Sequence, residues 1–523
     1  MSIHKFLKIN KKIIFKKNLN KYTLIIDRGR VVNTLYQTVY SSVINKKYNN
    51  DVKVILSNPP IMKSIFKSFG EMDFYKSSPL GSLKNIFLSI KGSLFILKNI
   101  KAITQNNLKG FVKNFKICDI IVGDLIYDTY IRYHHRYINP KIDLKFLKVV
   151  LFTYLKVNLI NDIIKNNNIK HILIAQTVNA TIGAIALRLG VKNNIKTIEP
   201  SLDFLNRKYF IKYNKNKINF GAYNFYYRYL TNDKKLLQKT KLNQKQFNNF
   251  FYKRCFGKIK LGYSGETDLW NANQNLSLNL SREKLIKNLK ISNKNINKII
   301  LVAFHAFSDA PHGDGSDIIF TDYYSHAKET LKFLKNQNNK NILYLIKPHP
   351  SRFLYNEHNL FENLFDEIVG DNENIKICPV YINTYNLISL CDSVVTLKGT
   401  IAIEFVSNGK RAVTCATTPY SKLNVLDEAR NKKEYFNKIK NLSLNSKKLS
   451  KKKIKIAQKV LFLMEKNIPE NFLGKSKIFD EKFVQSNRRA KSFDVYFNKS
   501  FINKIKKNGF LNDYYIKNLE KVI

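Results

Sequence analysis

Cysteine is scarce in this sequence of 523 residues, and no two cysteines lie close together. The five are Cys118, Cys255, Cys378, Cys391 and Cys415. This small, scattered set argues against a disulfide framework and a structural zinc site, and it is typical of a reducing cytoplasm. The hydrophobic content of 44% excludes global disorder, and together with the length it predicts two domains, each with a buried sheet.

Long hydrophobic runs are also missing. The most apolar tracts, Asn85–Leu97 and Val149–Ile164, are interrupted by Lys91 and Lys156 and are too short to cross a bilayer. The basic stretch after Met1 is not followed by the apolar segment that a secretory signal needs. We therefore expect a cytoplasmic protein, soluble or peripheral on the inner face of the cytoplasmic membrane.

Acidic residues are few, since 38 Asp and Glu stand against 90 Lys and Arg and give a formal net charge of +52. Such an excess suggests attraction to an anionic membrane surface or to anionic sugar donors. The lysines are, however, mixed throughout with asparagine and isoleucine, which is also the composition of an AT-rich genome. Zinc-finger spacings and aromatic RNA-binding signatures do not occur, so no specific nucleic-acid partner is expected.

Short runs of Ile, Val and Leu alternate with longer amphipathic stretches, a pattern that predicts parallel sheets with crossover helices. In the first half, strands are expected at Tyr22–Asp27, Asp51–Leu56, Cys118–Gly123, Ile169–Ala175 and Ile195–Glu199, and helices at Leu144–Asn166 and Asn179–Leu189, the latter with Gly190 as C-cap. In the second half, strands are expected at Lys298–Phe304, Asn341–Lys347, Ile375–Cys378, Ser393–Leu397 and Arg411–Cys415, and helices at Tyr323–Lys335 and Ile401–Asn408.

This pattern predicts an α/β protein with two Rossmann-like domains. The first is expected over residues 1–240 and the second over 298–440, with a connection at 241–297 and a basic helical extension at 441–523. The aromatic clusters Tyr223–Tyr229 and Phe247–Tyr252 are expected to pack rather than to stack on bases.

Three segments of the second domain follow predicted strands, where open parallel sheets bind their ligands. The first is the run His305–His312, whose two histidines and Asp309 supply donors, acceptors and titratable groups. A second carboxylate in register is missing, so no metal site is expected. Gly313 and Gly315 indicate a loop that approaches a ligand closely. A loop that only caps its strand is the alternative.

The second segment is Lys347–Pro350, at the end of its predicted strand. The two prolines fix the backbone around His349, so the imidazole is held in a set direction. A lysine point charge beside a directional imidazole donor suits a phosphate or diphosphate. A rigid turn with an incidental histidine is the alternative.

The third segment is Thr396–Glu404, in which a strand runs into Gly399 and a helix opens at Thr400. Backbone N–H groups and the positive end of the helix dipole then point to one place. Gly399 permits close approach to a phosphate, Thr400 adds a hydroxyl, and Glu404 is placed to meet a ribose hydroxyl. Neither a Walker loop nor a G-x-G-x-x-G motif occurs. This segment therefore indicates a phosphate-binding site only in combination with the other two segments.

At these residues the chain resembles the C-terminal domain of capsular-polysaccharide glycosyltransferases, which include the Kdo transferases of capsule and lipopolysaccharide assembly. The resemblance covers roughly residues 298–424 and rests on Lys347–Pro350, Val395–Glu404, Gly409 and Tyr420–Ser421, and on His305, Phe307 and Asp309 followed by Phe320–Tyr324. The His-Pro motif is also similar to that of bacterial GT-B sialyltransferases, whose histidine meets the phosphate of a CMP-sugar.

The resemblance implies a GT-B fold, with parallel sheets of two Rossmann-like domains facing a cleft, and an enzyme without cofactor or metal. It would move a sugar from a nucleotide-sugar donor, CMP-Kdo-like or UDP-linked, to a glycan or glycolipid acceptor of a surface or capsular polysaccharide. Five residues would bind the phosphate and nucleotide of the donor: Lys347, His349, Gly399, Thr400 and Glu404. His305 and Asp309 are catalytic candidates in the same domain.

The first domain carries no comparable resemblance, yet in a GT-B enzyme it should bind the acceptor and supply the general base. The best candidate is Asp124, which leaves a predicted strand beside a glycine, with Asp128 one helical turn later. An aspartate that caps a helix is the alternative. His134 and His135 are weaker candidates.

Three other functions remain open from the sequence. A GT-B sugar-nucleotide epimerase or polyol-phosphate transferase would use the same fold differently. A non-catalytic polysaccharide-binding or export-scaffold protein would keep the donor site without turnover. A nucleic-acid-binding protein would show a steep salt dependence of binding.

Overall fold

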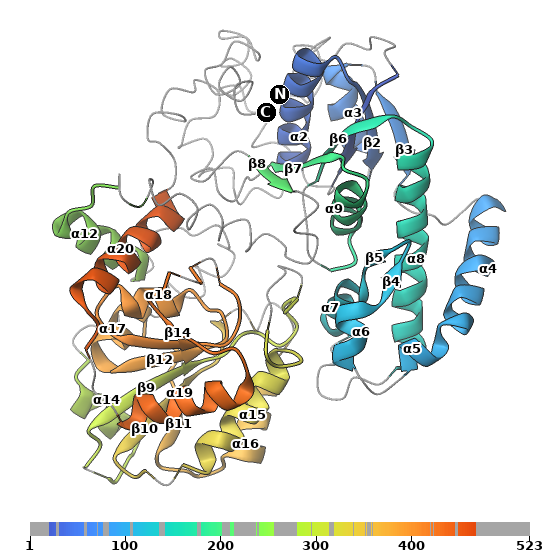
Figure 1. The fold of residues 1–523 in the computed structure, drawn as a ribbon. Helices are drawn as coiled ribbons and strands as arrows, with labels where there is room; N and C mark the ends of the chain where they lie inside the picture. Colours follow the sequence, from blue (N-terminus) through green and yellow to red (C-terminus); the bar gives the residue numbers. More distant parts are fainter. Residues whose placement is uncertain are drawn as a thin grey trace. The chain divides into compact units, whose positions relative to one another are not determined.

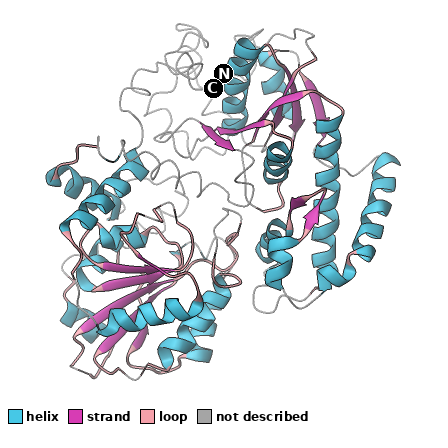
Figure 2. Ribbon diagram, in the orientation of Figure 1, coloured by secondary structure: helices cyan, strands magenta, loops and turns pink. Residues whose placement is uncertain are grey.

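The computed structural model contains two compact units, each an α/β domain (Figures 1 and 2). The first comprises the described residues up to Tyr130, those from 142 to 213, and residues 465 and 466. The second comprises Ile131–His134 and the described residues from 237 to 464. The structure describes residues 20–27, 31–56, 60–70, 72–76, 83–104, 108–134, 142–174, 179–200, 210–213, 237, 240–255, 280–293, 295–312, 318–337, 339–350, 352, 357, 359–418, 420–421, 423–444 and 448–466.

The first domain is built on a six-stranded sheet of order β3-β2-β1-β6-β7-β8. All neighbouring strands are parallel except β7 and β8, which are antiparallel. The strands are β1 (Tyr22–Ile26), β2 (Asp51–Leu56), β3 (Asp73–Lys76), β6 (Ile169–Leu173), β7 (Lys196–Pro200) and β8 (Phe210–Tyr213). The buried runs of β1 and β2 are nearly continuous, as expected for strands covered on both faces.

Eight helices accompany this sheet among the described residues. They are α2 (Val31–Tyr48), α3 (Pro60–Phe69), α4 (Leu83–Lys98), α5 (Ile100–Thr104), α6 (Leu108–Asn114), α7 (Gly123–His134), α8 (Leu144–Lys165) and α9 (Ile182–Lys192). The helix predicted at Leu144–Asn166 is confirmed as α8, which begins where the Asp143 carboxylate accepts a hydrogen bond from the N–H of Phe146.

The strand predicted at Cys118–Gly123 is wrong. Cys118 and Asp119 have φ values of 48° and 60° and form a two-residue turn between β4 (Lys116–Ile117) and β5 (Ile120–Ile121). This short antiparallel hairpin lies outside the six-stranded sheet, and α7 starts directly at Gly123. An apolar run shows that a segment is buried, but it does not show which strand the segment pairs with.

The C-cap predicted at Gly190 is also wrong. Gly190 lies inside α9, and Asn193 caps that helix. A Cβ atom at position 190 would collide with the Thr197 hydroxyl of β7 and would lie 2.9 Å from Ile172 Cδ1 of β6. The glycine therefore serves the close packing of α9 on the sheet rather than the end of the helix.

The second domain has a fully parallel six-stranded sheet of order β11-β10-β9-β12-β13-β14. The strands are β9 (Lys298–Ala303), β10 (Ile342–Lys347), β11 (Ile375–Ile377), β12 (Ser393–Thr396), β13 (Arg411–Thr414) and β14 (Asp427–Glu428). The first five match the predicted strands to within one residue at each end. Both sheets therefore have the strand order of a Rossmann fold, which confirms the prediction of two Rossmann-like domains.

The helices between these strands are α15 (Tyr323–Lys335), α16 (Leu360–Ile368), α17 (Thr384–Leu390), α18 (Ile401–Val406) and α19 (Lys432–Leu444). The α15 helix has the predicted bounds and is capped by Asp322, whose carboxylate accepts from the N–H of Ser325. The α18 helix is shorter than predicted because Gly409, with φ of 77°, reverses the chain just after it.

Three further helices, α12 (Gln244–Cys255), α14 (Arg282–Asn288) and α20 (Lys451–Lys466), complete the core of the second domain. Phe247, Phe250 and Phe251 are buried there, and the ring of Phe250 meets that of Phe462 edge to face at 5.4 Å. The aromatics of Phe247–Tyr252 thus pack, as predicted, whereas Tyr223–Tyr229 lies outside the described residues. Among the helices described, none has the length and apolar sequence needed to cross a bilayer.

Candidate functional site

The candidate site lies at the carboxyl edge of the second sheet. The strand β9 is flanked by β10 and β12, and the chain fills the sheet first on the β10 side and then on the β12 side. The carboxyl ends of β9 and β12 therefore form the switch point at which open sheets bind ligands. His305 follows β9, His349 follows β10, and Lys398 and Gly399 follow β12.

His305 and His349 lie side by side. Their ring centroids are 6.0 Å apart and their planes differ by 13°, and His305 also stacks on Tyr323 at 4.6 Å. Within the part of the chain that is described, the buried Nε2 atom of His305 has no hydrogen-bond partner. A buried polar atom without a partner costs free energy, so this atom is suited to pair with a ligand.

Burial lowers the pKa of His305 well below its usual value, and repulsion from His349, when that residue is protonated, and from Lys398 lowers the pKa further. Burial also lowers the pKa of His349, with Lys347 and Arg352 acting in the same direction and Asp309 opposing them. Both imidazoles are therefore neutral near pH 7, so each offers one N–H donor and one acceptor nitrogen.

Two lysines bring positive charge to this edge. Lys398 is buried, its Nζ donates to the carbonyl of Pro311 at 3.3 Å, and the same atom lies 5.5 Å from the ring centroid of Tyr323. The Nζ of Lys347 donates to the carbonyl of Ile382 at 3.4 Å. Sequence reasoning missed Lys398, although it stands directly before Gly399 in the predicted phosphate-binding segment.

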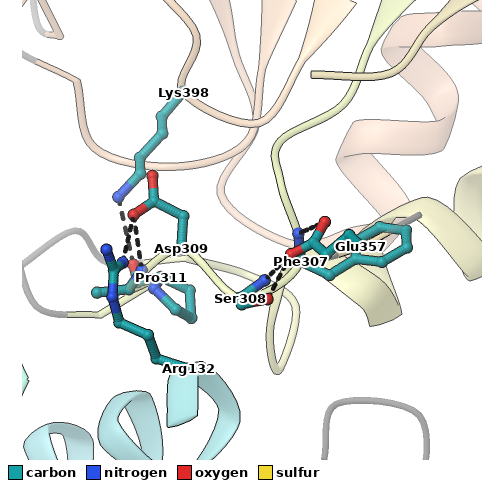
Figure 3. A network of polar contacts seen from close by, with 8 residues as sticks. Arg132, Phe307, Ser308, Asp309, Pro311, Glu357 and Lys398 are labelled. Atoms are coloured by element: carbon teal, nitrogen blue, oxygen red, sulfur yellow. Dashed lines mark hydrogen bonds and ion pairs between the residues drawn. The ribbon is translucent and has the colours of Figure 1, made fainter. Parts of the chain in front are cut away.

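The loop after β9 is held in shape by Glu357 (Figure 3). The buried carboxylate accepts from the N–H groups of Phe307 and Ser308, at 2.9 and 2.6 Å, and from the Ser308 hydroxyl at 2.5 Å. Burial raises the pKa of Glu357, and these three hydrogen bonds oppose the rise. The sequence offered no local signal for this role because Glu357 lies about fifty residues from the loop.

Asp309 lies in the same loop, with 45% of its side chain exposed. Its Oδ1 accepts from Nη1 of Arg132 at 3.2 Å and from the N–H of Ala310 at 3.1 Å (Figure 3). Its carboxylate thus stands at the open side of the loop and opposes the lowering of the His349 pKa.

Gly399 is positioned by Tyr420, whose hydroxyl donates to the Gly399 carbonyl at 2.7 Å. This contact joins two motifs that lie twenty-one residues apart in the chain. Thr400 caps α18 without a hydrogen bond from its side chain. Because α18 has only six residues, its dipole is weaker than a longer helix would supply.

Glu404 is buried against α12, where its Oε1 lies 2.9 Å from both Nε and Nη2 of Arg254. The two side chains are 9% and 6% exposed. Sequence reasoning did not anticipate this ion pair. The ribose contact predicted for Glu404 stays a prediction.

Asp124 lies in the first turn of α7, and its two carboxylate oxygens accept from Nη1 and Nη2 of Arg188 at 2.6 and 2.5 Å. A general base needs a carboxylate oxygen open to the acceptor, and this ion pair occupies both. His135 lies outside the described residues.

Asp27 is a carboxylate that sequence reasoning missed in the first domain. It directly follows β1, beside β6 at the switch point of the first sheet. It is buried, and its Oδ1 accepts from the hydroxyl of Thr34 at 2.8 Å. The signal was present in the sequence, because Asp27 ends the first predicted strand.

Across the described residues, no three His, Cys, Asp or Glu side chains are grouped to hold a metal ion. The polar groups described at the edge of the second sheet are two imidazoles, two lysines and the carboxylate of Asp309. The imidazoles and lysines outnumber the carboxylate. Their common preference is for an anion with several acceptor oxygens, such as a phosphate.

No family model matches the sequence, and no curated protein matches it. Among solved structures, the chain is similar to the β-Kdo 2,4 transferase KpsC of Thermosulfurimonas dismutans, with 11% identity and a TM-score of 0.31 over 56% of this chain and 79% of that one. It is also similar to HepE of Anabaena in complex with UDP and glucose, with 11% identity and a TM-score of 0.26 over 89% and 97% of the two chains. A third similar structure is the UDP-GlcNAc 2-epimerase of Neisseria meningitidis bound to UDP-GlcNAc, with 10% identity and a TM-score of 0.26 over 84% and 98%.

At such TM-scores the whole chains do not superpose closely, so the fold is assigned from the two sheets themselves. The chain thus consists of two Rossmann-like domains, the composition of the GT-B fold.

Proposed function

We propose that the protein is a glycosyltransferase whose second domain binds a nucleotide-sugar by its phosphate and whose first domain binds a glycan or glycolipid acceptor. The proposal rests on the position of His305 beside His349, and on the buried Nε2 of His305, which has no hydrogen-bond partner among the residues that the structure describes. Lys398 lowers the pKa of His305 and Lys347 lowers that of His349, so both lysines bring positive charge to the two imidazoles.

The chemistry of sugar transfer suits these groups. As the bond between the anomeric carbon and the phosphate oxygen breaks, negative charge grows on the leaving phosphate. Neutral imidazole N–H groups and lysine ammonium groups, already in place, stabilise that charge in the transition state. They supply what a divalent cation supplies in other transferases, which supports a mechanism without metal.

The acceptor hydroxyl attacks the anomeric carbon and gives its proton to a base. In this proposal the base is a carboxylate of the first domain. We expect it to be Asp27 rather than Asp124, because Arg188 binds both carboxylate oxygens of Asp124. The motifs shared with capsular-polysaccharide glycosyltransferases support a surface or capsular polysaccharide as the product, made on the cytoplasmic side of the membrane.

Thermal unfolding with CMP, UDP, GDP and their sugars tests donor binding. A ligand that binds only the folded state at one hundred times its Kd stabilises the protein by about 2.7 kcal/mol. We expect one nucleotide family to raise the Tm of the wild type and to raise that of His349→Ala much less. If no nucleotide changes the Tm of the wild type, the donor site is refuted.

Product analysis then separates the activities. Release of the nucleotide that depends on an added acceptor supports transfer, whereas conversion of the donor sugar without acceptor supports an epimerase. Donor binding with no product under either condition supports a polysaccharide-binding scaffold.

A further inference from the structure

The α4 helix of the first domain exposes a row of large apolar side chains. Ile86, Phe87, Ile90, Leu94 and Leu97 are between 54% and 65% exposed. At 3.6 residues per turn they fall within about 100° of arc and form one continuous stripe. Isolated exposed apolar side chains are ordinary on protein surfaces, but a stripe of five marks a binding surface.

The opposite face of α4 already has its partners. Gly92 packs so closely on α8 that a Cβ atom there would lie 2.6 Å from Leu151 Cδ1. The ring of Phe95 lies 4.9 Å from that of Tyr154, and Ile96 is 8% exposed. In Figure 1, α4 runs along α8. The inner face therefore fixes the helix, and the stripe contributes nothing to the core of the domain.

The charge around the stripe has one sign. Between Asp73 and Asp119 the chain contains no Asp or Glu but eight lysines: Lys76, Lys84, Lys91, Lys98, Lys101, Lys109, Lys113 and Lys116. Lys91 and Lys98 are exposed and follow the edge of the stripe, and the Nζ of Lys91 lies 4.5 Å from the ring centroid of Phe87. An apolar face bordered by lysines and free of acidic residues is the pattern of a helix that lies in a membrane interface.

A second copy of this chain fits the stripe poorly. A symmetric dimer would place the same patch of both copies face to face, and the lysines of each would then meet the lysines of the other. An anionic bilayer offers hydrocarbon for the stripe and phosphates for the lysines together. The charge complementarity therefore favours lipid.

We propose that α4 docks the protein on an anionic lipid bilayer, with the apolar stripe in the boundary between headgroups and acyl chains and with Lys91 and Lys98 against lipid phosphates. A helix of this length is about 24 Å long and lies flat at a depth of about 5–10 Å. The surface lies on α4, in the first domain, and does not depend on donor binding.

Sedimentation of the full chain with vesicles tests the stripe. The vesicles contain phosphatidylcholine with about 30 mol% phosphatidylglycerol, at low salt. Phe87→Ser/Leu94→Ser is expected to weaken partitioning at least ten-fold, because each side chain loses its burial in lipid. The matched control is Val380→Ser/Leu444→Ser, which removes apolar side chains that are 63% and 62% exposed in the second domain. This control is expected to partition like the wild type.

The lysines are tested separately. Lys91→Gln/Lys98→Gln is expected to weaken partitioning by about five-fold for each lysine at low salt. Lys284→Gln/Lys287→Gln on α14 changes the net charge equally, at exposed positions of the second domain, and is expected to leave partitioning nearly unchanged.

Circular dichroism and the Tm of each variant establish that it is folded. Equal binding by the wild type and the α4 variants would overturn the proposal, as would an equal loss in the control variants. An oligomer that the α4 variants convert to monomers, with no vesicle binding by the wild type, would identify a second copy as the occupant. Nucleotide binding by the α4 variants is expected to be unchanged, so this result is separate from that of the donor site.

Discussion

The two domains have sheets of the same order but carboxyl edges of different chemistry. In both, the first strand lies in the middle, beside the fourth, and the chain fills one side before the other. The second edge carries His305, His349 and Lys398, whereas the first has the buried carboxylate of Asp27, held by Thr34. Strand order therefore places the site, while the residues that follow each strand decide whether it attracts an anion or accepts a proton.

Each domain also contains a largely buried ion pair between an arginine and a carboxylate. Arg188 and Asp124 join α9 to α7 in the first, and Arg254 and Glu404 join α12 to α18 in the second. Both carboxylates were predicted from the sequence to act on substrate. Each also has a structural partner in its own domain, so variants that separate packing from function test both predictions.

The largest effect is expected from Arg254→Met. It leaves the carboxylate of Glu404 buried and unpaired, which should lower the free energy of unfolding by about 3–5 kcal/mol, measured by urea denaturation. Arg254→Met/Glu404→Leu should recover most of this loss. If the double variant also keeps its donor affinity, Glu404 has no ribose contact, whereas a ten-fold weaker affinity would retain that contact.

Glu357→Ala tests how the loop after β9, at the carboxyl edge of the second sheet, is held in shape. The variant leaves the N–H groups of Phe307 and Ser308 without their hydrogen-bond acceptor. This should lower the free energy of unfolding by about 2–5 kcal/mol and should also weaken binding of the nucleotide-sugar. Glu329→Ala breaks an exposed pair with Lys432 and should cost less than about 1 kcal/mol. Equal losses in the two variants would show that Glu357 does not organise the loop.

His349→Ala tests the anion-binding edge directly. Loss of a hydrogen-bond donor to the developing negative charge should reduce the rate of sugar transfer by about ten- to a thousand-fold with the Tm unchanged. Thr400→Val should weaken binding of the nucleotide-sugar more modestly.

The pH dependence of binding tests the same contact. The pKa of His349 is lowered in the free protein, and a bound phosphate would raise it, so binding takes up a proton between these two pKa values. Affinity for a nucleotide-sugar should therefore rise as pH falls through that window, and a titration that shows the reverse would contradict the contact.

The loss of stability at acid pH allows a comparison of the buried histidines in the two domains. Burial lowers the pKa of His326 in the second domain to about 3 and that of His171 in the first to about 4. The unfolded chain takes up these protons below its pKa of about 6.5, so stability is full above that pH and falls as pH decreases toward the folded pKa values. Each histidine should cost about 2 kcal/mol by pH 5. His326→Phe should remove this slope in the second domain only, as measured by thermal unfolding between pH 7 and 5. An unchanged slope would show that the pKa of His326 is the same in the folded and the unfolded chain.

The smallest effect is expected from Asp124→Asn. Because both oxygens of Asp124 bind Arg188, the rate of transfer per folded molecule should change less than about three-fold, while Asp27→Asn should reduce it by about a hundred-fold as the loss of a general base does. Acceptor-dependent product release measures both rates. A hundred-fold loss in Asp124→Asn alone would identify Asp124 as the base.

Periodicity alone determined most of the second domain. Strands β9 to β13 and the bounds of α15 follow from local alternation, because buried parallel strands read as short apolar runs and helices as longer amphipathic ones. The placement of His305 and His349 at one edge also followed, because the ends of parallel strands share an edge. These features depend on residues close together in the chain.

Tertiary structure alone decided the features that depend on distant partners. Local sequence did not show that Cys118 and Asp119 turn a separate hairpin or that Glu357 holds a loop fifty residues away. The sequence likewise showed that Asn85–Leu97 is apolar, but only the packing of Gly92 on α8 showed which face of α4 is covered. Hydrogen bonding and burial are properties of pairs of segments, so they are determined only when the chain has folded.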